Sequence, residues 1–396
     1  MIRGAALAAE FNPLHNGHRY IMKQAEIKTG ADFLGVVMSG NFTQRGEPAV
    51  FDKFLRTKTA LLNGADIVLE LPVVYATGAA DIFAEGCCKT IESAGIFNYM
   101  VFGCEAKNTE ILTAASDILT NEPTAFKTAL KENSKKGLSF PKARELALCS
   151  LLSAESEVFS MPNNILAVEY IKQLKFLNSE VIPVGIKRLG ADYRDENINS
   201  CFSSASAVRK ALGEKRTEEV SSAVPENVFS LYIEEIKKGS RCLNDYTEML
   251  RYIILKTGAE GLKEICDITE GLENKIYKNS DFETAESLAD RLKSKRYTRT
   301  KLTRGLLHIL LDIKKEDVMP PKPLPYIRVL GVKKNKTQLL GLLSENAKVP
   351  VLINIKKDIE KLSPSGRTLF AKETFASDLY DLGKKGDDFT KGLIIV

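Results

Sequence analysis

The chain has 396 residues, of which 44% are apolar and 27% charged, the balance of a globular protein with room for two or three domains. No apolar run reaches the roughly 20 residues that cross a bilayer, and the N-terminal segment lacks the apolar core of a secretion signal, so we expect a cytoplasmic protein. The net charge of +5 permits an anionic partner without requiring one. Seven cysteines without a CxxC pair argue against both a disulfide framework and a cysteine zinc site.

Over residues 1–215, short apolar runs alternate with segments of helical spacing. Strands that alternate with helices indicate a parallel sheet covered on both faces, so the expected fold class is α/β. The first expected helix should end at Gly30, a typical C-terminal cap. The expected strands lie at 4–11, 32–40, 65–72, 99–103 and 179–185, and the expected helices between the first three strands lie at 19–30 and 51–64.

The pattern changes after about residue 215. Residues 216–317 form long, charged segments of helical spacing, which predict a helical, basic region. Four prolines within residues 318–325 exclude a regular helix or a central strand there and indicate a linker. Beyond the linker, two strand patterns flank a helical one, which predicts a small C-terminal α/β domain over residues 326–396.

The most informative stretch is FNPLHNGH, residues 11–18, because it holds two of the three histidines in the chain. A strand ends before it, a proline stiffens the turn, and a helix begins near Asn16. Residues three apart share a helix face, so His15 and His18 are expected to project together at the helix entry. The exposed N–H groups and the positive dipole end suit an anion there, and Gly17 leaves space for it. Imidazoles donate hydrogen bonds and, when protonated, add positive charge, so the stretch predicts a polyphosphate site.

Two alternatives remain open for these histidines. A zinc site would need a third ligand, and the remaining histidine, His308, lies in the apolar stretch LLHILL. The two rings could also merely cap and pack the start of the helix. The strand, Asn-Pro and glycine context favours the phosphate site.

An ordered set of motifs extends over roughly residues 2–330: EFNPLHNGH, MSGNFTQRGEPAVFDKFLRTKTAL, ADIVLELP, FGCE, MPNNILAVEYIK, GIKRLGADY, SSASAVRKAL and SKRYTRTKLTRGLLHILL. The first motif resembles the HxGH signature of the nucleotidylyltransferase superfamily, whose members attack the α-phosphate of a nucleoside triphosphate and release pyrophosphate. The whole set resembles the bacterial tRNA(Met) cytidine acetate ligase family. The resemblance implies a Rossmann-like, ATP-binding domain at 1–215 and a tRNA-binding region at 216–317. It further implies that acetate is activated as acetyl-adenylate and transferred to N4 of the wobble cytidine of elongator tRNA(Met).

The same resemblance implies which residues bind ATP. His15 and His18 are the implied catalytic residues, which stabilise charge on the phosphates as pyrophosphate leaves, and Mg²⁺ is expected with ATP. The implied ATP-binding residues are Leu7, Ala8, Ala9, Glu10, Phe11, Asn12, Pro13, Leu14, His15, Asn16, Gly17, His18, Arg19, Tyr20, Gly103, Asn163, Asn164, Arg188, Ser203 and Ser206.

Structural roles compete with ATP binding at the later positions. Gly103 could simply form a tight turn, and Arg188 could belong to a solvated surface pair. One of Asn163 and Asn164 is implied to contact ATP, although both are good helix caps. The serines of SSASAVRKAL could offer hydroxyl and N–H groups to phosphate, with Arg209 one turn further on, or could likewise be plain caps.

Polar and basic residues outside this set predict the site of the second substrate. The stretch after the second expected strand offers Ser39, Gln44 and Arg45 to acetate or cytidine, and offers Lys53 and Arg56 to phosphate or tRNA. The later stretch RLKSKRYTRTKLTR has seven basic residues, no acidic one and a tyrosine that could stack on an anticodon-loop base. Such density favours a nucleic-acid contact over a plain basic surface. The residues predicted to contact tRNA there are Lys295, Arg296, Tyr297, Arg299, Lys301 and Arg304.

Two other functions share parts of this pattern. A small-molecule adenylyltransferase or a pantothenate-synthetase-like ligase would use the same histidines without a basic tRNA platform. A non-catalytic nucleotide- or RNA-binding protein would keep the domain but show no acetate-dependent exchange between ATP and pyrophosphate.

Overall fold

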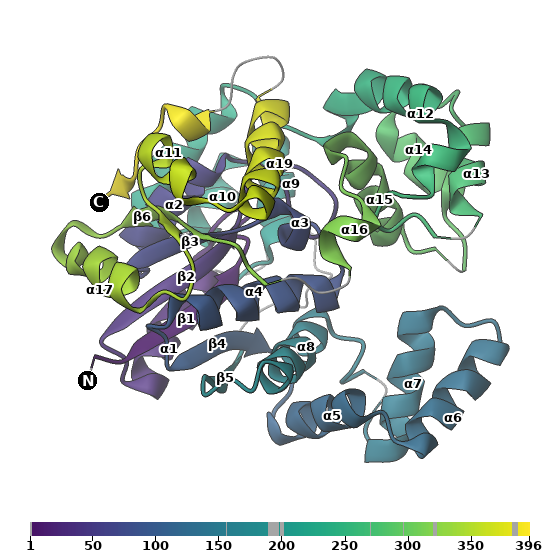
Figure 1. Ribbon diagram of the computed structural model, residues 1–396, viewed down its shortest axis with the longest axis horizontal. Helices are drawn as coiled ribbons and strands as arrows, with labels where there is room; N and C mark the ends of the chain where they lie inside the picture. The colour runs from purple at the N-terminus through teal and green to yellow at the C-terminus, as the bar shows by residue number, and fades with distance from the viewer. Residues whose placement is uncertain are drawn as a thin grey trace.

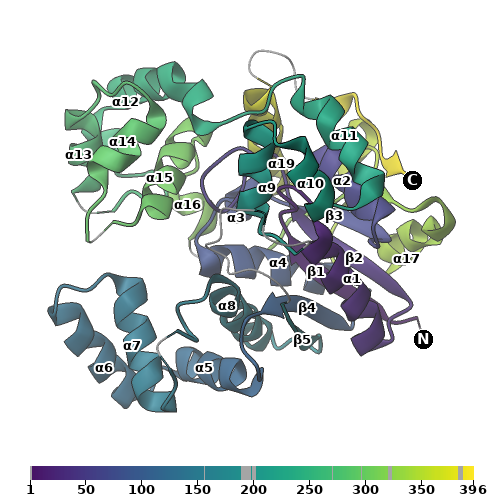
Figure 2. The same cartoon turned by 180° about the vertical axis from the view of Figure 1, so that it is seen from behind.

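The structure is a computed structural model that describes residues 2–155, 157–188, 198, 202–269, 271–295, 297–319, 323–381 and 387–396. Within these residues, one eight-stranded sheet lies at the centre and helices cover both of its faces (Figures 1 and 2). The predicted α/β class is confirmed, and each strand predicted before residue 215 is present with small shifts at its ends. The strands are β1 (Gly4–Ala9), β2 (Phe33–Ser39), β3 (Ile67–Leu71), β4 (Tyr99–Cys104), β5 (Ile182–Lys187), β6 (Ile327–Val332), β7 (Val351–Leu352) and β8 (Ile394–Ile395).

The strand order places a ligand crevice at the carboxyl end of β1. The sheet runs β5-β4-β1-β2-β3-β6-β7, with β8 paired to β6, and β1 to β5 are parallel. Because β1 pairs with β2 on one side and with β4 on the other, the strand order reverses at β1. Open α/β sheets bind ligands at such a switch point, outside the carboxyl ends of the strands. The turn that leaves β1 carries the two histidines.

Alternation along β1 divides the apolar core between the two faces of the sheet. Ala5 and Leu7 belong to one apolar cluster and Ala6 to the other, because successive side chains of a strand point to opposite faces. Helices that follow the strands contribute the rest of each cluster. The first face is covered by α1 (Asn16–Thr29) and α2 (Lys53–Leu62), and the second by α4 (Ala80–Ala94) and α8 (Pro162–Phe176).

Three further groups of helices surround the sheet. The described elements between residues 216 and 317 are all helical, as the sequence predicts. The first group is α5 (Glu110–Asn121), α6 (Thr124–Lys135) and α7 (Phe140–Leu152), and the second is α9 (Ala205–Gly213), α10 (Thr217–Ala223) and α11 (Glu226–Ile236). The third is η1 (Leu243–Tyr246), α12 (Thr247–Leu262), α13 (Leu272–Lys278), α14 (Ala285–Leu292), α15 (Arg299–Leu311) and α16 (Lys315–Val318), and the short α3 (Val73–Ala76) precedes α4. The first and third groups project as lobes on the same side of the sheet (Figure 1). None of the described helices is long and apolar enough to span a bilayer.

Residues 326–396, predicted as a small C-terminal α/β domain, contribute strands to the central sheet. Strand β6 pairs antiparallel with β3 and all six of its residues are buried, so this segment completes the central sheet. An edge strand such as β3 exposes unpaired backbone groups, and β6 satisfies them. The remaining elements are η2 (Lys334–Lys336), α17 (Gln338–Asn346), α18 (Ile355–Asp358), η3 (Ile359–Lys361), α19 (Pro364–Tyr380) and η4 (Asp387–Phe389).

Candidate active site

A cavity of about 520 Å³ opens at the carboxyl ends of β1 and β4, where the strand order predicts ligand binding. The turn after β1, the segment after β2, and helices α4, α8, α9 and α15 contribute to its wall. The predicted ATP-binding residues that line it are Leu7, Ala8, Ala9, Glu10, Phe11, Asn12, His15, His18, Gly103, Asn163, Arg188 and Ser206.

The other predicted ATP-binding residues lie outside the described cavity wall. The side-chain amide of Asn16 donates to the carbonyl of Ser222 at 3.0 Å, and Arg19 is exposed. Helical spacing explains the difference, because Ile21 follows His18 on the same face and does reach the cavity. The residues concerned are Pro13, Leu14, Asn16, Gly17, Arg19, Tyr20, Asn164 and Ser203.

The two histidines lie together at the start of α1. His15 is the N-cap residue, and its Nδ1 accepts a hydrogen bond from the N–H of Gly17 at 3.1 Å. His18 Nδ1 accepts from the N–H of His15 at 3.3 Å, and the ring centroids are 3.8 Å apart. Since Nδ1 is the acceptor in both rings, the neutral form of each carries its proton on Nε2. The pair therefore caps the helix, as one alternative predicted, and still presents two Nε2–H donors.

Burial keeps both imidazoles neutral. Burial lowers the pKa of His15 to about 3, and the charges of Arg188 and Arg209 lower it further. Burial also lowers the pKa of His18 well below its usual value, with smaller effects from His15 and Arg188. Of the two contributions considered for the imidazoles, neutral hydrogen-bond donation therefore applies, and the positive charge at the cavity comes from the arginines.

The lowered pKa of His15 predicts a loss of stability in mild acid. As pH falls through 6.5, the unfolded chain takes up a proton that the folded His15 refuses until about pH 3, so the free energy of unfolding decreases across this range. His15→Asn retains a capping acceptor but not the titration. The free energy of unfolding is measured with urea at about pH 7 and at about pH 5. Its decrease between the two pH values should be smaller for the variant than for the wild type. Equal decreases in the two proteins would contradict the lowered pKa of His15.

Comparison with known proteins identifies the family. A family model described as HIGH Nucleotidyl Transferase matches residues 3–392. The tRNA(Met) cytidine acetate ligase of Caldanaerobacter subterraneus subsp. tengcongensis is 38% identical over 390 residues, which cover 97% of this chain and 96% of that protein. The chain belongs to this family. It is therefore an enzyme of the ligase class.

Other members of the family are also similar to this chain in sequence and in structure. The tRNA(Met) cytidine acetate ligase of Caldicellulosiruptor saccharolyticus is 40% identical and covers 97% of this chain and 95% of its own. A crystal structure described as Thermotoga maritima TmcAL bound with alpha-thio ATP superposes with a TM-score of 0.90 at 32% identity, over 100% of this chain and 99% of that one. The apo form of the same protein gives a TM-score of 0.93.

The two asparagines at the start of α8 have different roles in the ligase. Asn163 lines the cavity, and its side-chain oxygen accepts from Arg188 at 3.4 Å. Asn164 is buried, and its side-chain oxygen accepts from the backbone N–H groups of Glu105 and Ala106 at 2.8 and 3.0 Å. Asn164 therefore anchors the segment after β4. Asn163 also donates to the side chain of Glu105 in that segment, but unlike Asn164 it lies in the cavity wall together with Arg188.

The start of α9 supplies a serine and an arginine to the cavity. Ser204 caps the helix by accepting from the N–H of Ala207, which is the structural role predicted as an alternative for this serine cluster. Ser206 and Arg209 line the cavity, and Arg209 donates to the carbonyl of Asn12 at 2.7 Å. Arg209 follows Ser206 by about one helical turn, which is why the sequence placed it beside the predicted phosphate contacts, although it was not counted among the predicted ATP-binding residues.

Arg56 does not meet phosphate or tRNA, which corrects its predicted role. Its side chain is completely buried, and its guanidinium donates to the carbonyls of Glu10, Ser39, Gly40 and Phe51. These carbonyls lie just beyond the end of β1, at and just beyond the end of β2, and just before α2. Arg56 thus fixes the backbone on which the cavity is built. Ser39, predicted to bind substrate, is also buried and lies outside the described wall.

Lys53 is a second correction, because it is buried in an ion-pair network rather than exposed to substrate. Its Nζ lies 2.7 Å from Glu70 Oε1 and 2.7 Å from Asp388 Oδ1. The partners belong to β3 and to η4, more than 300 residues apart along the chain, so the sequence around Lys53 carries no sign of them.

Helix α15 and the segment after β2 form one wall of the cavity together. Gln44, Arg45, Thr300 and Arg304 line it, so three of the predicted substrate residues do lie at the site. Gly46 explains the close packing: its φ is +77°, and a Cβ there would lie 2.3 Å from the backbone nitrogen of Arg304.

The basic stretch before and within α15 is less available to tRNA than its sequence suggests. Tyr297 is buried beneath the ammonium groups of Lys275 and Lys301, so its predicted stacking on a base is corrected. Arg299 pairs with Asp290 at 3.0 Å. Lys295 is exposed, and Arg296 lies outside the described residues. Acidic residues that precede the stretch thus neutralise part of its charge.

Apolar residues complete the cavity and were not predicted. They come from α4 and α8, which pack against the second face of the sheet. Helical spacing indicates that such residues are buried but not that they border a cavity. They are Ala80, Phe83, Ile165, Leu166 and Tyr170.

Cys266, Asp267 and His308 form a compact group whose potential ligand atoms lie within 4.8 Å of one another. Burial raises the pKa of the Cys266 thiol to about 12, so the thiolate that metals bind is disfavoured. The carboxylate of Asp267 is already paired with Arg304 at 2.8 and 3.2 Å. Asp267 of this group therefore holds Arg304.

Proposed function

We propose that the ligase activates acetate with ATP and transfers the acetyl group to N4 of the wobble cytidine of elongator tRNA(Met). Relatives named tRNA(Met) cytidine acetate ligase and the family structure bound with alpha-thio ATP support this function. The observation that carries the proposal is the pair of neutral imidazoles at the carboxyl end of β1, in the wall of a cavity that Arg188 and Arg209 also line.

In the first step, a carboxylate oxygen of acetate attacks the α-phosphorus of ATP. The bond from that phosphorus to the bridging oxygen breaks, pyrophosphate leaves, and acetyl-AMP remains. Negative charge accumulates on the leaving group, where Nε2–H donors of His15 and His18 would stabilise it. Arg188 and Arg209 would add charge-assisted hydrogen bonds. No side chain has to form a covalent bond.

Mg²⁺ is expected to accompany ATP, and the cavity offers one group that fits it. Glu10 is the only acidic residue in the described wall, and its Oε1 accepts from the N–H of Gln44 at 2.8 Å. Mg²⁺ commonly binds phosphates, water and only one or two carboxylates, so Glu10 would suffice as its protein ligand. Such an ion would neutralise charge on the phosphates.

In the second step, the exocyclic amine of cytidine attacks the acetyl carbonyl, AMP leaves, and the amine releases a proton. Holding the mixed anhydride and the cytosine base in one cavity would account for much of the rate acceleration. Thr300 at the cavity wall is exposed, and the exposed Lys295 and half-buried Arg299 lie in the same segment. We therefore assign the tRNA approach to this side of α15.

Mass spectrometry of tRNA tests the proposal. Elongator tRNA(Met) incubated with the ligase, ATP and labelled acetate should carry the label on N4 of the wobble cytidine, and a tRNA with uridine at that position should not. Adenylylation of a small molecule with unmodified tRNA would favour the small-molecule ligase. Binding of ATP or tRNA without any turnover would favour the non-catalytic alternative.

A further inference from the structure

Arg304 is held in the cavity wall by a carboxylate from outside the nucleotide-binding sheet. Its Nε and Nη2 donate to Oδ2 and Oδ1 of Asp267 at 2.8 and 3.2 Å. Both side chains are almost buried, at 12% and 13% exposure, so water competes little for the contact. No acceptor in the described part of the chain meets the remaining guanidinium nitrogen, Nη1. The contact therefore fixes the guanidinium plane and leaves Nη1 to a ligand.

Polar contacts extend from Asp267 to another wall of the cavity. His308 is fully buried, with its Nδ1 3.6 Å from Asp267 Oδ2 and its Nε2 3.1 Å from the carbonyl of Thr77. Thr77 ends α3, and Ala80 and Phe83 of the following helix line the cavity. These contacts join a cationic wall to an apolar wall.

The turn that carries Asp267 is built to lie against α15. The φ angle of Asp267 is 63°, in the left-handed region that aspartate and asparagine adopt more readily than most other side chains. Gly305 packs so closely on this turn that a Cβ would lie 3.0 Å from Ile268 Cδ1. The position of the carboxylate beside Arg304 is thus set by both backbone and packing.

The described cavity wall carries two pairs of arginines with different neighbours. Arg209 donates to the carbonyl of Asn12 in the turn that carries the histidines, and Arg188 donates to Asn163 at the start of α8. Arg45 and Arg304 come from the segment after β2 and from α15. One pair therefore suits the polyphosphate, and the other suits a second, separate anion.

We propose that Asp267 is a positioning residue that orients Arg304 to receive the carboxylate of acetate, with the methyl group against Ala80 and Phe83. The inference rests on the proposed function, in which acetate is the second anion. A guanidinium N–H such as that of Nη1 donates a charge-assisted hydrogen bond to a carboxylate, and the apolar wall would limit the length of the acyl chain. A tRNA backbone phosphate is the competing ligand for Arg304, and the experiment separates the two.

Asp267→Asn is the test variant, because asparagine tolerates the left-handed backbone and removes only the charge and one acceptor oxygen. The matched control is Asp281→Asn, which makes the same change at an exposed ion pair with Arg291. Initial rates of labelled acetate incorporation into tRNA are measured while acetate, ATP and tRNA are varied in turn. The KM for acetate should rise about tenfold or more in Asp267→Asn, since charge-assisted hydrogen bonds contribute about 1.5–3 kcal/mol. The KM for ATP and the KM for tRNA should stay within about twofold, as should every constant of the control.

The possible results distinguish a failure of the proposed function from a failure of the positioning role of Asp267. Wild-type protein that incorporates no acetate would end the proposed function itself. An active wild type with an unchanged KM for acetate in Asp267→Asn, or with equal increases for acetate and ATP, would overturn the positioning role. A rise confined to the KM for tRNA would assign Arg304 to phosphate instead. If thermal melting shows that Asp267→Asn is unfolded, Arg304→Lys keeps the charge without the fork, and the same acetate-specific increase is required of it.

Discussion

His18→Asn should lower the rate of pyrophosphate release about a hundredfold to a thousandfold, the usual effect of removing one preorganised donor from a developing anion. The asparagine side-chain oxygen can still accept from the N–H of His15, as Nδ1 does in the native ring. The Nε2–H donor is lost. Pyrophosphate release is measured with ATP, acetate and tRNA at saturation, so that the change reports the chemical step.

Two further variants isolate the role of the Nε2–H group. His18→Gln places an amide donor near the position of Nε2 and should retain more activity than His18→Asn. Lys23→Ala changes an exposed residue of the same helix and should leave the rate within about twofold. Equal losses in the asparagine and glutamine variants, together with unchanged melting temperatures, would show that the donor is not what the reaction uses.

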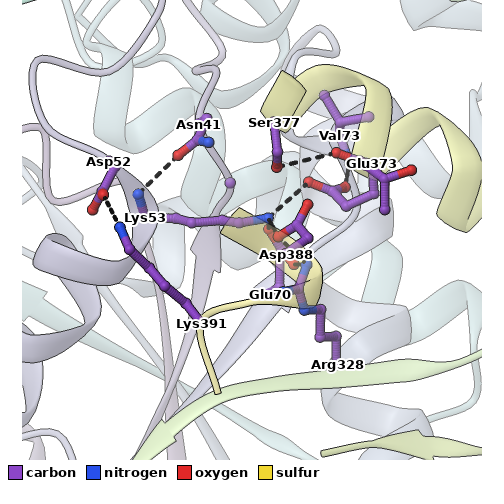
Figure 3. A network of polar contacts seen from close by, with 12 residues as sticks. Asn41, Asp52, Lys53, Glu70, Val73, Arg328, Glu373, Ser377, Asp388 and Lys391 are labelled. Carbon is purple, nitrogen blue, oxygen red and sulfur yellow. Dashed lines mark hydrogen bonds and ion pairs between the residues drawn. The ribbon is translucent and has the colours of Figure 1, made fainter. Parts of the chain in front are cut away.

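Lys53→Met should lower the free energy of unfolding by about 3–5 kcal/mol, the cost of breaking a buried ion pair from one side. Lys53 points into a cluster formed by Glu70, Arg328, Glu373 and Asp388 (Figure 3). Arg328 Nη1 lies 2.8 Å from both Glu70 Oε2 and Asp388 Oδ1, and each of these side chains is at most 3% exposed.

The charges of this cluster balance only when Lys53 is present. Lys53 and Arg328 supply two positive charges. Burial alone would raise the pKa of Asp388, but these two cations lower it to about 2, so it stays charged beside Glu70. Burial, reinforced by the charge of Glu70, raises the pKa of Glu373 well above its usual range and keeps that group neutral. Methionine would leave one arginine facing two carboxylates.

Urea unfolding of Lys53→Met is compared with that of Lys391→Met. Lys391 pairs with Asp52 at 2.9 Å, but the two side chains are 40% and 26% exposed, so its loss should cost no more than about 1 kcal/mol. A similar, small change in the free energy of unfolding of both variants would contradict the conclusion that Lys53 balances the charges of the cluster. The cluster links β3 and β6 to α19 and η4, and so ties the C-terminal segment to the central sheet.

The parts of the molecule that follow from local patterns were predictable from the sequence. Strand β1, helix α1 and its cap at Gly30 follow from apolar spacing and a left-handed glycine. The position of His15 and His18 on one helix face follows from the same spacing. Gly103 and Asn163, in β4 and at the start of α8, were implied by the family resemblance rather than by their spacing, and both line the cavity.

The rest depends on partners that are remote in the sequence. A buried lysine such as Lys53 looks like a surface lysine until Glu70 and Asp388 are seen beside it. Tyr297 looks available for stacking until Lys275 from another helix covers it. The pairing of β6 with β3 likewise depends on which strand edge is free, and no spacing within residues 326–396 indicates that edge.

Transfer of oxygen from acetate to AMP tests the central claim most directly. The ligase is supplied with ATP, tRNA and acetate labelled with heavy oxygen at both positions, and the released nucleotide is analysed by mass spectrometry. If acetate attacks the α-phosphorus held beside His15 and His18, the nucleotide is AMP and carries one heavy oxygen. Unlabelled AMP, or ADP in its place, would contradict the account.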